Sequence, residues 1–175
     1  MTFTSEEMNI LWQHQGNFVV DCVLVGCYSG WRPDEMLSIK LEDVDLEKGS
    51  MIGGNKNKSS KDRIVPIHSK IFPIIENFYQ IAKRTNCEYL ISQDGKRFIY
   101  RSYLTKFHSM CKSYGLDPKH RLHDCRVRFV TEAKYQNMDE YALKRIVGHS
   151  IPDITERVYS KRGIDWLKSE IEKIK

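Results

Sequence analysis

The longest apolar stretch of the chain, Phe18 to Cys27, sets the strongest limit on how the chain can fold. It contains Asp21 and is too short to cross a bilayer, so it predicts a mostly buried helix from Asn17 to Tyr28 that ends at Ser29-Gly30. A helix that is apolar on most of its sides lies inside a core. With 175 residues, of which 41% are hydrophobic and 29% charged, the chain is large enough to form that core as one globular domain.

Further helices are predicted from apolar residues at helical spacing and from the residues that begin and end helices. Thr4 and Glu7 form a capping box before a first helix that reaches about Gln13. Pro33 suits the first turn of a short helix through Leu37. The remaining helices are predicted at Ser69 to Arg84, Tyr100 to Tyr114, His123 to Tyr135, Asp139 to Val147 and Asp165 to Ile174.

Short runs bounded by Gly and Asn replace the helical pattern between Val44 and His68. Ser50 to Gly53 and Arg63 to Ile67 predict a β-hairpin with basic residues at its tip, and Tyr89 to Ile91 is the candidate third strand. The expected fold class is therefore α+β and mainly α-helical, a single domain over residues 1–175 with a small three-stranded antiparallel sheet.

Charge and cysteine content narrow the class of protein. The 28 lysines and arginines against 23 acidic residues give a net charge of +5 and a pI near 8.9, which is compatible with a nucleic-acid partner. Five cysteines without a Cys-x-x-Cys pair indicate neither a disulfide framework nor a zinc knuckle, so reduced thiols in a cytoplasmic protein are expected. No charged-then-apolar leader opens the chain, and neither secretion nor a membrane partner is expected.

Four short contexts that lie far apart in the sequence carry residue types suited to one reaction. Arg32 stands in Gly-Trp-Arg-Pro-Asp-Glu, and His123 and Arg126 form a His-x-x-Arg on one helical face. His149 follows a Val-Gly pair, and Tyr159 comes ten residues later. A phosphodiester repels nucleophiles because its non-bridging oxygens share a negative charge, which arginine forks can hold at any relevant pH. A phenol is both a nucleophile and a good leaving group, so its bond to phosphorus is reversible.

In these contexts the chain resembles the catalytic domain of the tyrosine recombinases, or phage-type integrases, over nearly its whole length. The resemblance implies a tyrosine recombinase-like fold and a site-specific DNA recombinase. Tyr159 would attack a DNA phosphate, form a 3′-phosphotyrosyl link and release a 5′ hydroxyl. Arg32, Arg126 and His149 would stabilise the transition state, and His123 would handle the proton of the tyrosine.

The resemblance also implies that a lysine of the β-hairpin protonates the leaving 5′ oxygen. Lys56, Lys58 and Lys61 compete for this role, and the setting Asn-Lys-Asn-Lys best matches the Lys-Thr-Lys of the family at Lys56. The alternative is that all three lysines only contact phosphates. Glu35 matches an acidic residue that orients Arg32 or the catalytic histidine rather than reacting. The residues expected to contact DNA are Lys58, Lys61, Arg63, Arg121 and Arg128.

Double-stranded DNA is the partner that the resemblance implies, in the recombination or integration of a mobile genetic element, and no cofactor or metal is expected. Family members usually carry an N-terminal DNA-binding domain, which is expected to be absent from this chain. A tetramer on DNA is expected for the full-length protein, with the helix from Trp166 to Ile174 as a candidate for docking on a neighbouring protomer.

Other interpretations share part of this sequence evidence. A type IB topoisomerase uses the same chemistry to relax supercoils, and a catalytically inactive DNA-binding module would keep the fold without a covalent adduct. His120 and His123, with Cys125 nearby, can be read as metal ligands, but no third and fourth ligand stand at suitable spacing. The sequence departs from the family at Cys125, at Val127-Arg128 and at Asn57, none of which is a reacting group.

Overall fold

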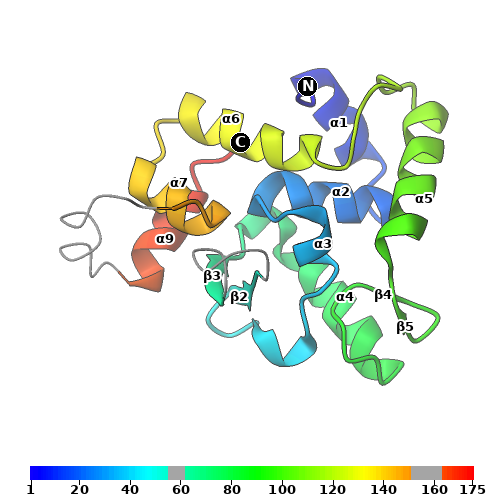
Figure 1. Cartoon of the computed structure of the whole chain (residues 1–175), viewed down its shortest axis with the longest axis horizontal. Coiled ribbons are helices and arrows are strands. Elements are labelled where there is room, and N and C mark those ends of the chain that lie inside the picture. Colours follow the sequence, from blue (N-terminus) through cyan, green and yellow to red (C-terminus); the bar gives the residue numbers. More distant parts are fainter. Residues whose placement is uncertain (55–61, 151–162) are drawn as a thin grey trace.

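The protein is described by a computed structural model that covers residues 1–54, 62–150 and 163–175. The described residues are mainly α-helical, with a three-stranded and a two-stranded antiparallel sheet (Figure 1). The helices are α1 (Ser5–Gln13), α2 (Phe18–Ser29), α3 (Pro33–Met36), α4 (Phe72–Arg84), α5 (Tyr100–Ser113), α6 (Asp124–Tyr135), α7 (Glu140–Val147) and α9 (Ile164–Ile171), with the 3-10 helices η1 (Leu41–Asp43) and η2 (Ser69–Ile71). The strands are β1 (Val44–Asp45), β2 (Ser50–Gly53), β3 (Arg63–Pro66), β4 (Ser92–Gln93) and β5 (Lys96–Arg97). None of the described helices is long and apolar enough to cross a membrane.

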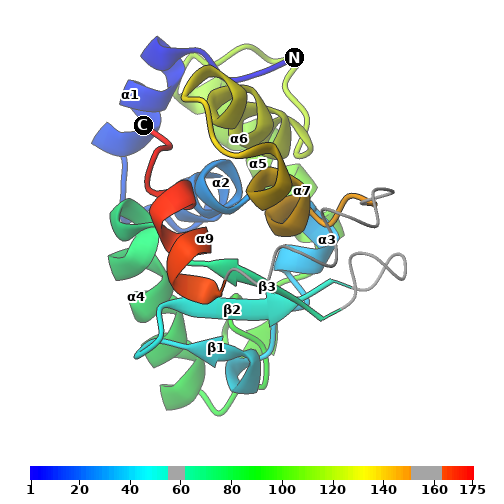
Figure 2. The same ribbon diagram turned by 90° about the vertical axis from the view of Figure 1, so that its left-hand side faces the viewer.

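Helix α2 is the central element of the fold. Figure 2 views it end-on, with α1, α6, α7, α9 and the three-stranded sheet arranged around it. Every residue of α2 from Val19 to Ser29 is buried, which confirms the buried helix predicted from the apolar stretch. The side chain of Asn17 caps its start by accepting hydrogen bonds from the N–H groups of Val19 and Val20, and Gly30 ends it in the left-handed conformation with φ 67°.

The ends of the other helices agree with their sequence signals to within a few residues. Thr4 and Glu7 form the predicted capping box, with Thr4 N donating to Glu7 Oε2 at 2.9 Å. Asp139 caps α7, and Gly148 closes that helix with φ 68°. His149 therefore follows directly after α7, as its sequence context predicts.

The predicted hairpin is confirmed, but the predicted third strand is wrong. Strands β2 and β3 pair with Gly53 opposite Arg63, and β1 forms the other edge of the sheet. The Tyr89 to Ile91 segment makes an isolated bridge between Tyr89 and Lys40 instead. Leu90 and Ile91 of this segment are buried in the core. A short apolar run in a sequence does not distinguish such burial from strand pairing.

Strand β3 connects the sheet to the C-terminal half of the chain. It contacts both α7 and α9 (Figure 2). Leu167 and Ile171 of α9 and Ile174 beyond it are buried, with the Ile174 carbonyl 2.9 Å from Nε2 of His68. In this structure the C-terminal helix thus packs on its own domain, and its docking on a neighbouring protomer stays a prediction.

We predict that Gly30 tolerates a side chain less than other glycines of the same conformation. Gly30 and Gly115 share a φ of +67°, but a Cβ at Gly30 would lie 2.5 Å from Cδ1 of the buried Phe129, whereas nothing lies within 4 Å at Gly115. Gly115→Ala should cost about 1 kcal/mol for the left-handed conformation. Gly30→Ala should cost about 1–3 kcal/mol more, because α6 must move. Denaturant unfolding measures both losses, and equal losses would contradict this account.

Candidate active site

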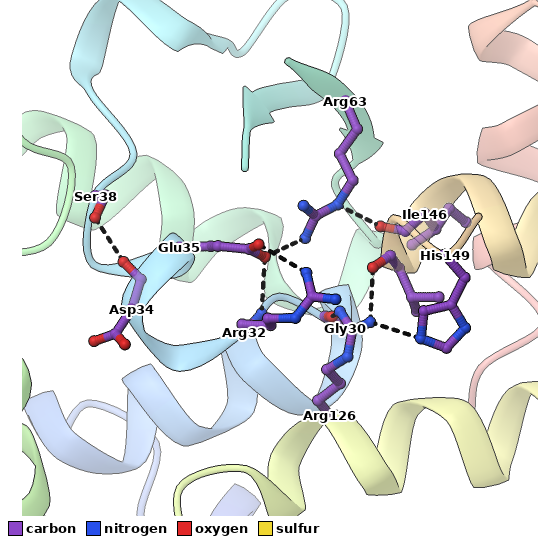
Figure 3. Close-up of polar contacts among 10 residues, drawn as sticks. Gly30, Arg32, Asp34, Glu35, Ser38, Arg63, Arg126, Ile146 and His149 are labelled. Carbon is purple, nitrogen blue, oxygen red and sulfur yellow. Dashed lines mark hydrogen bonds and ion pairs between the residues drawn. The ribbon is translucent and has the colours of Figure 1, made fainter. Parts of the chain in front are cut away.

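Three arginines, one glutamate and one histidine from the α3 segment, β3, α6 and the end of α7 lie together (Figure 3). Arg32 and Glu35 lie at the start and in the middle of the α3 segment, and Arg63 opens β3. Arg126 lies in the first turn of α6, and His149 follows α7. The structure thus brings Arg32, Arg126 and His149 into one cluster, although they are far apart in the sequence.

The guanidinium of Arg126 joins the ends of two helices. Its Nη1 donates to the carbonyl of Gly30, the C-cap of α2, and its Nη2 donates to the carbonyl of Val147, the last residue of α7, both at 2.7 Å. The final carbonyls of a helix lack partners within the helix, and a cation suits the negative end of the helix dipole. Arg126 is only 4% exposed, so both helix ends fix its orientation before any ligand arrives.

Glu35 divides its two carboxylate oxygens between two arginines. Arg32 Nη1 donates to Oε1 at 2.8 Å, and Arg63 Nη2 donates to Oε2 at 2.7 Å. Burial by itself would raise the pKa of Glu35, but the hydrogen bonds and charges of Arg63 and Arg32 outweigh it and hold the pKa below its usual value. Glu35 is therefore ionised at neutral pH and orients both guanidinium groups.

Arg63 does not occupy the exposed position expected for a DNA contact at the hairpin. It is 7% exposed, its Nε donates to the carbonyl of Ile146 at 2.9 Å, and its guanidinium lies 4.0 Å from the ring centre of Trp31. Alternation along β3 explains its direction, because Arg63 and Val65 face the interior while Ile64 faces solvent.

The two histidines lie at the edge of the arginine cluster, where each is exposed on one side and covered by the protein on the other. Arg126 Nη2 lies 3.1 Å from Nε2 of His149, and because arginine can only donate, Nε2 accepts and the ring proton is on Nδ1. Burial and the positive charges of Arg126, Arg32 and Arg63 lower the pKa of His149. Burial and Arg126 likewise lower the pKa of His123, at the N-terminus of α6. Both imidazoles are therefore neutral at pH 7.

The remaining predicted site residues fall into two groups. Lys56, Lys58, Lys61 and Tyr159 lie outside the described residues. Arg121 is at the surface, with its side chain 75% exposed, where it remains a candidate DNA contact. Arg128 is placed differently from expectation: it pairs with Glu132 at 3.1 Å and lines a cavity with Trp12 and Tyr28. It lies about 200° around the helix from Arg126, because successive helical residues are about 100° apart.

His120 has a structural role within the described residues. One of its ring nitrogens lies 3.0 Å from Glu7 Oε1 and the other 3.1 Å from Asp124 Oδ2, and the ring stacks on Phe3 at 4.0 Å. These contacts tie α1 to the start of α6. The interpretation of His120 and His123 as a metal pair is therefore not needed to explain His120.

Sequence reasoning misses two parts of the cluster. The first is the set of carbonyl groups of Gly30, Ile146 and Val147, which hold arginines although backbone atoms leave no residue-type signal. The second is the inward direction of Arg63. Its spacing of two from the apolar Val65 in a predicted strand is the signal that indicates an interior position.

The cluster is suited to bind a tetrahedral oxyanion. Three arginines against one glutamate leave two positive charges unbalanced among these residues (3 − 1 = 2). Burial and the neighbouring arginines lower the pKa of Arg126 to about 10, so it remains charged at neutral pH. Guanidinium forks match the geometry of phosphate oxygens, and an anion would relieve the repulsion among the arginines.

Comparisons with known proteins identify the family of the chain. A model of the phage integrase family matches residues 17–163. The tyrosine recombinase XerA of Thermococcus kodakarensis is 28% identical over 151 residues, which are 84% of this chain and 52% of that protein. The crystal structure of XerA recombinase has a TM-score of 0.73 at 21% identity, covering 97% of this chain and 63% of that one. The Tn1549 transposon integrase in complex with circular intermediate DNA has a TM-score of 0.72 at 20% identity, covering 98% and 64%.

This chain covers only part of the length of each of these proteins. The chain spans about half the length of the curated relatives that it matches. The solved structures are less than 25% identical and show that the fold is shared.

We predict that the pKa of His149 reports anion binding at the cluster. In the free protein it should titrate below the ordinary value of about 6.5, and sulfate added at constant ionic strength should raise it, because an anion offsets the arginine charges. Since the folded pKa is the lower one, protons bind the unfolded chain more tightly. The contribution of the neutral His149 imidazole to the free energy of unfolding is therefore present above about pH 6.5 and is lost as the pH falls below that value.

An NMR titration of the imidazole resonances measures this pKa. Arg32→Ala is the control, because it removes one anion-binding group while the contacts of Arg126 with the helix ends remain. A His149 midpoint that sulfate does not move in the unsubstituted protein would rule out an oxyanion site at the cluster.

Proposed function

This chain belongs to the phage integrase family of tyrosine recombinases, and from that membership we propose that it is the catalytic part of a site-specific DNA recombinase. The observation that carries the proposal is the cluster of Arg32, Arg126 and His149, whose positive charge the described residues neutralise only in part. Such a cluster stabilises the charge that develops on the oxygens of a phosphodiester under attack. The Tn1549 integrase, which shares the fold, is known in complex with DNA.

The proposed reaction exchanges one phosphoester for another. The hydroxyl oxygen of Tyr159 attacks a DNA phosphorus and its proton passes to His123, while the bond to the 5′ oxygen breaks and that oxygen takes a proton from Lys56. The product is a 3′-phosphotyrosyl link and a free 5′ hydroxyl. A 5′ hydroxyl from another strand then reverses the steps and rejoins the DNA, so the bond energy is conserved.

The described residues fit these roles by their charge states. Arg126 and Arg32 remain cationic and are held in place by helix ends and by Glu35 respectively, so little reorganisation accompanies the reaction. The lowered pKa of His123 keeps its imidazole neutral and able to accept a proton. A bound phosphate would raise the pKa of His149, and its imidazolium form would give up the contact of Nε2 with Arg126 and could donate a hydrogen bond to a phosphate oxygen.

The partner proposed is double-stranded DNA, contacted through its backbone by the exposed Arg121 and by Lys58 and Lys61. For the complete protein we propose a tetramer on DNA, because two duplexes must each be cut on both strands for a full exchange.

We predict that Tyr159→Phe abolishes covalent attachment to DNA while leaving DNA affinity unchanged, since only the phenolic oxygen is removed. The measurement uses a pool of end-labelled, nicked duplexes with randomised sequence at low salt, followed by denaturing electrophoresis. Tyr135→Phe is the matched control, because Tyr135 is 80% exposed at the end of α6 farthest from His123 and should leave the adduct unchanged.

Each result of that experiment decides between functions. An adduct at the level of the unsubstituted protein in Tyr159→Phe would exclude Tyr159 as the nucleophile. No adduct even in the unsubstituted protein, with DNA affinity intact, would indicate an inactive DNA-binding module. Relaxation of a supercoiled plasmid without strand exchange would indicate a topoisomerase.

We predict that Lys56→Ala slows cleavage and is rescued by DNA with a 5′-bridging phosphorothiolate, whose sulfur leaves without a proton. Lys58→Ala is the matched control on the same segment and should show no rescue, because it is expected only to contact phosphate. Rescue of Lys58→Ala but not of Lys56→Ala, measured as single-turnover cleavage rates, would move the general acid to Lys58.

A further inference from the structure

Arg63 is a buried cation for which the proposed chemistry has no use. Its side chain is 5% exposed, and its guanidinium lies over the ring of Trp31 at 4.0 Å. A phosphate of duplex DNA cannot approach a guanidinium that the indole and the interior already cover. The question is therefore what a charge held so deeply beside the cluster does.

Two hydrogen bonds of Arg63 run in different directions. Through Nη2 it binds Oε2 of Glu35, whose Oε1 binds Arg32. Through Nε it binds the carbonyl of Ile146 in the last turn of α7, one residue before the Val147 carbonyl that holds Arg126. One planar side chain thus links the segment that carries Arg32 to the helix end that carries His149.

We propose that Arg63 is a positioning residue that fixes the separation between Arg32 on one side of the phosphate site and the Arg126–His149 pair on the other. The inference rests on the proposed function and adds a residue to it. Without Arg63, Glu35 would be free to turn toward Arg32. The end of α7 would also lose the link that Arg63 makes to the α3 segment. A misplacement of about 1 Å at a reacting group can lower a rate by about 100-fold.

Lysine cannot replace arginine in this position. A guanidinium presents Nε and Nη2 in fixed directions and stacks flat on an indole, whereas an ammonium is a point donor on a flexible chain. Arg63→Lys should therefore preserve the charge opposite Glu35 but lose the tie to Ile146. Arg63→Met should lose both.

The test compares these variants with an arginine outside the cluster that makes similar contacts but is exposed. Arg97 also donates from Nε to a backbone carbonyl, that of Leu37 at 2.9 Å, and also lies over an aromatic ring, that of Tyr89 at 4.8 Å. Arg97→Met therefore controls for the loss of a stacked, carbonyl-bound arginine as such. All variants are first checked for folding by thermal unfolding.

Single-turnover cleavage and DNA affinity are then measured on the nicked duplex pool, beginning with the unsubstituted protein. Absence of its adduct would contradict the proposed function itself, before any variant is compared. Where that adduct forms, we expect Arg63→Lys and Arg63→Met to lower the cleavage rate roughly 10- to 100-fold, with the DNA dissociation constant and its salt dependence unchanged. Arg97→Met should cleave at the unsubstituted rate.

A 5′-bridging phosphorothiolate separates positioning of the arginines from an effect on the general acid. We expect no rescue of the Arg63 variants, because the sulfur leaving group replaces only the proton donor. Rescue, or a weaker affinity with a salt slope smaller by about 1, would overturn the proposal in favour of the lysine segment or of a phosphate contact respectively. Arg63→Lys that unfolds where Arg97→Met stays folded would also overturn it, since Arg63 would then be required for folding itself.

Discussion

The fold depends on how the last carbonyl groups of two helices are satisfied. Helix α2 is buried along its length and ends inside the protein at Gly30, and α7 ends beside it at Val147. Unpaired carbonyls at such buried ends would cost about 1–3 kcal/mol each. Arg126 satisfies both with one guanidinium, and Arg63 binds the neighbouring carbonyl of Ile146. The groups that complete the helices are thus the groups that create a positively charged site.

Among the residues that the structure describes, that charge is balanced only in part. Glu35 is one carboxylate shared between two arginines, while Arg126 has backbone dipoles in place of an anion. Burial together with this surplus of positive charge lowers the pKa of His149 and of Arg126 itself. The arginines of the cluster therefore repel one another in the free protein, and in the proposed reaction a phosphate oxygen would supply negative charge. The site is preorganised, because the free energy of folding already overcomes the repulsion among these arginines.

Much of this arrangement follows from local sequence signals. Asn17, Gly30, Asp139 and Gly148 mark helix ends by caps and left-handed turns, and these ends place Arg32 and His149 correctly at element junctions. The third strand could not be predicted in the same way, because an apolar run such as Tyr89 to Ile91 has the same pattern whether it pairs or is simply buried. The strand alternation of Arg63 with Val65 indicates an inward side chain, but the contact of β3 with α7 that covers it is tertiary and has no local signal. The identities of Tyr159 and Lys56 as reacting groups stay predictions from resemblance.

Arg126 and Arg32, the two arginines proposed to bind the phosphate, differ in how much the fold depends on them. This difference bears on how the two positions are expected to change among related sequences. Arg126 completes two helices, so selection for a stable fold is expected to retain it even where the reaction is no longer needed. Arg32 is partly exposed and pairs with Glu35, whose other oxygen Arg63 still holds. In a lineage released from selection for recombination, Arg32 is the position expected to drift first. The presence of Arg126 in a homologue is therefore weak evidence that it is active, whereas Arg32 is the more informative marker.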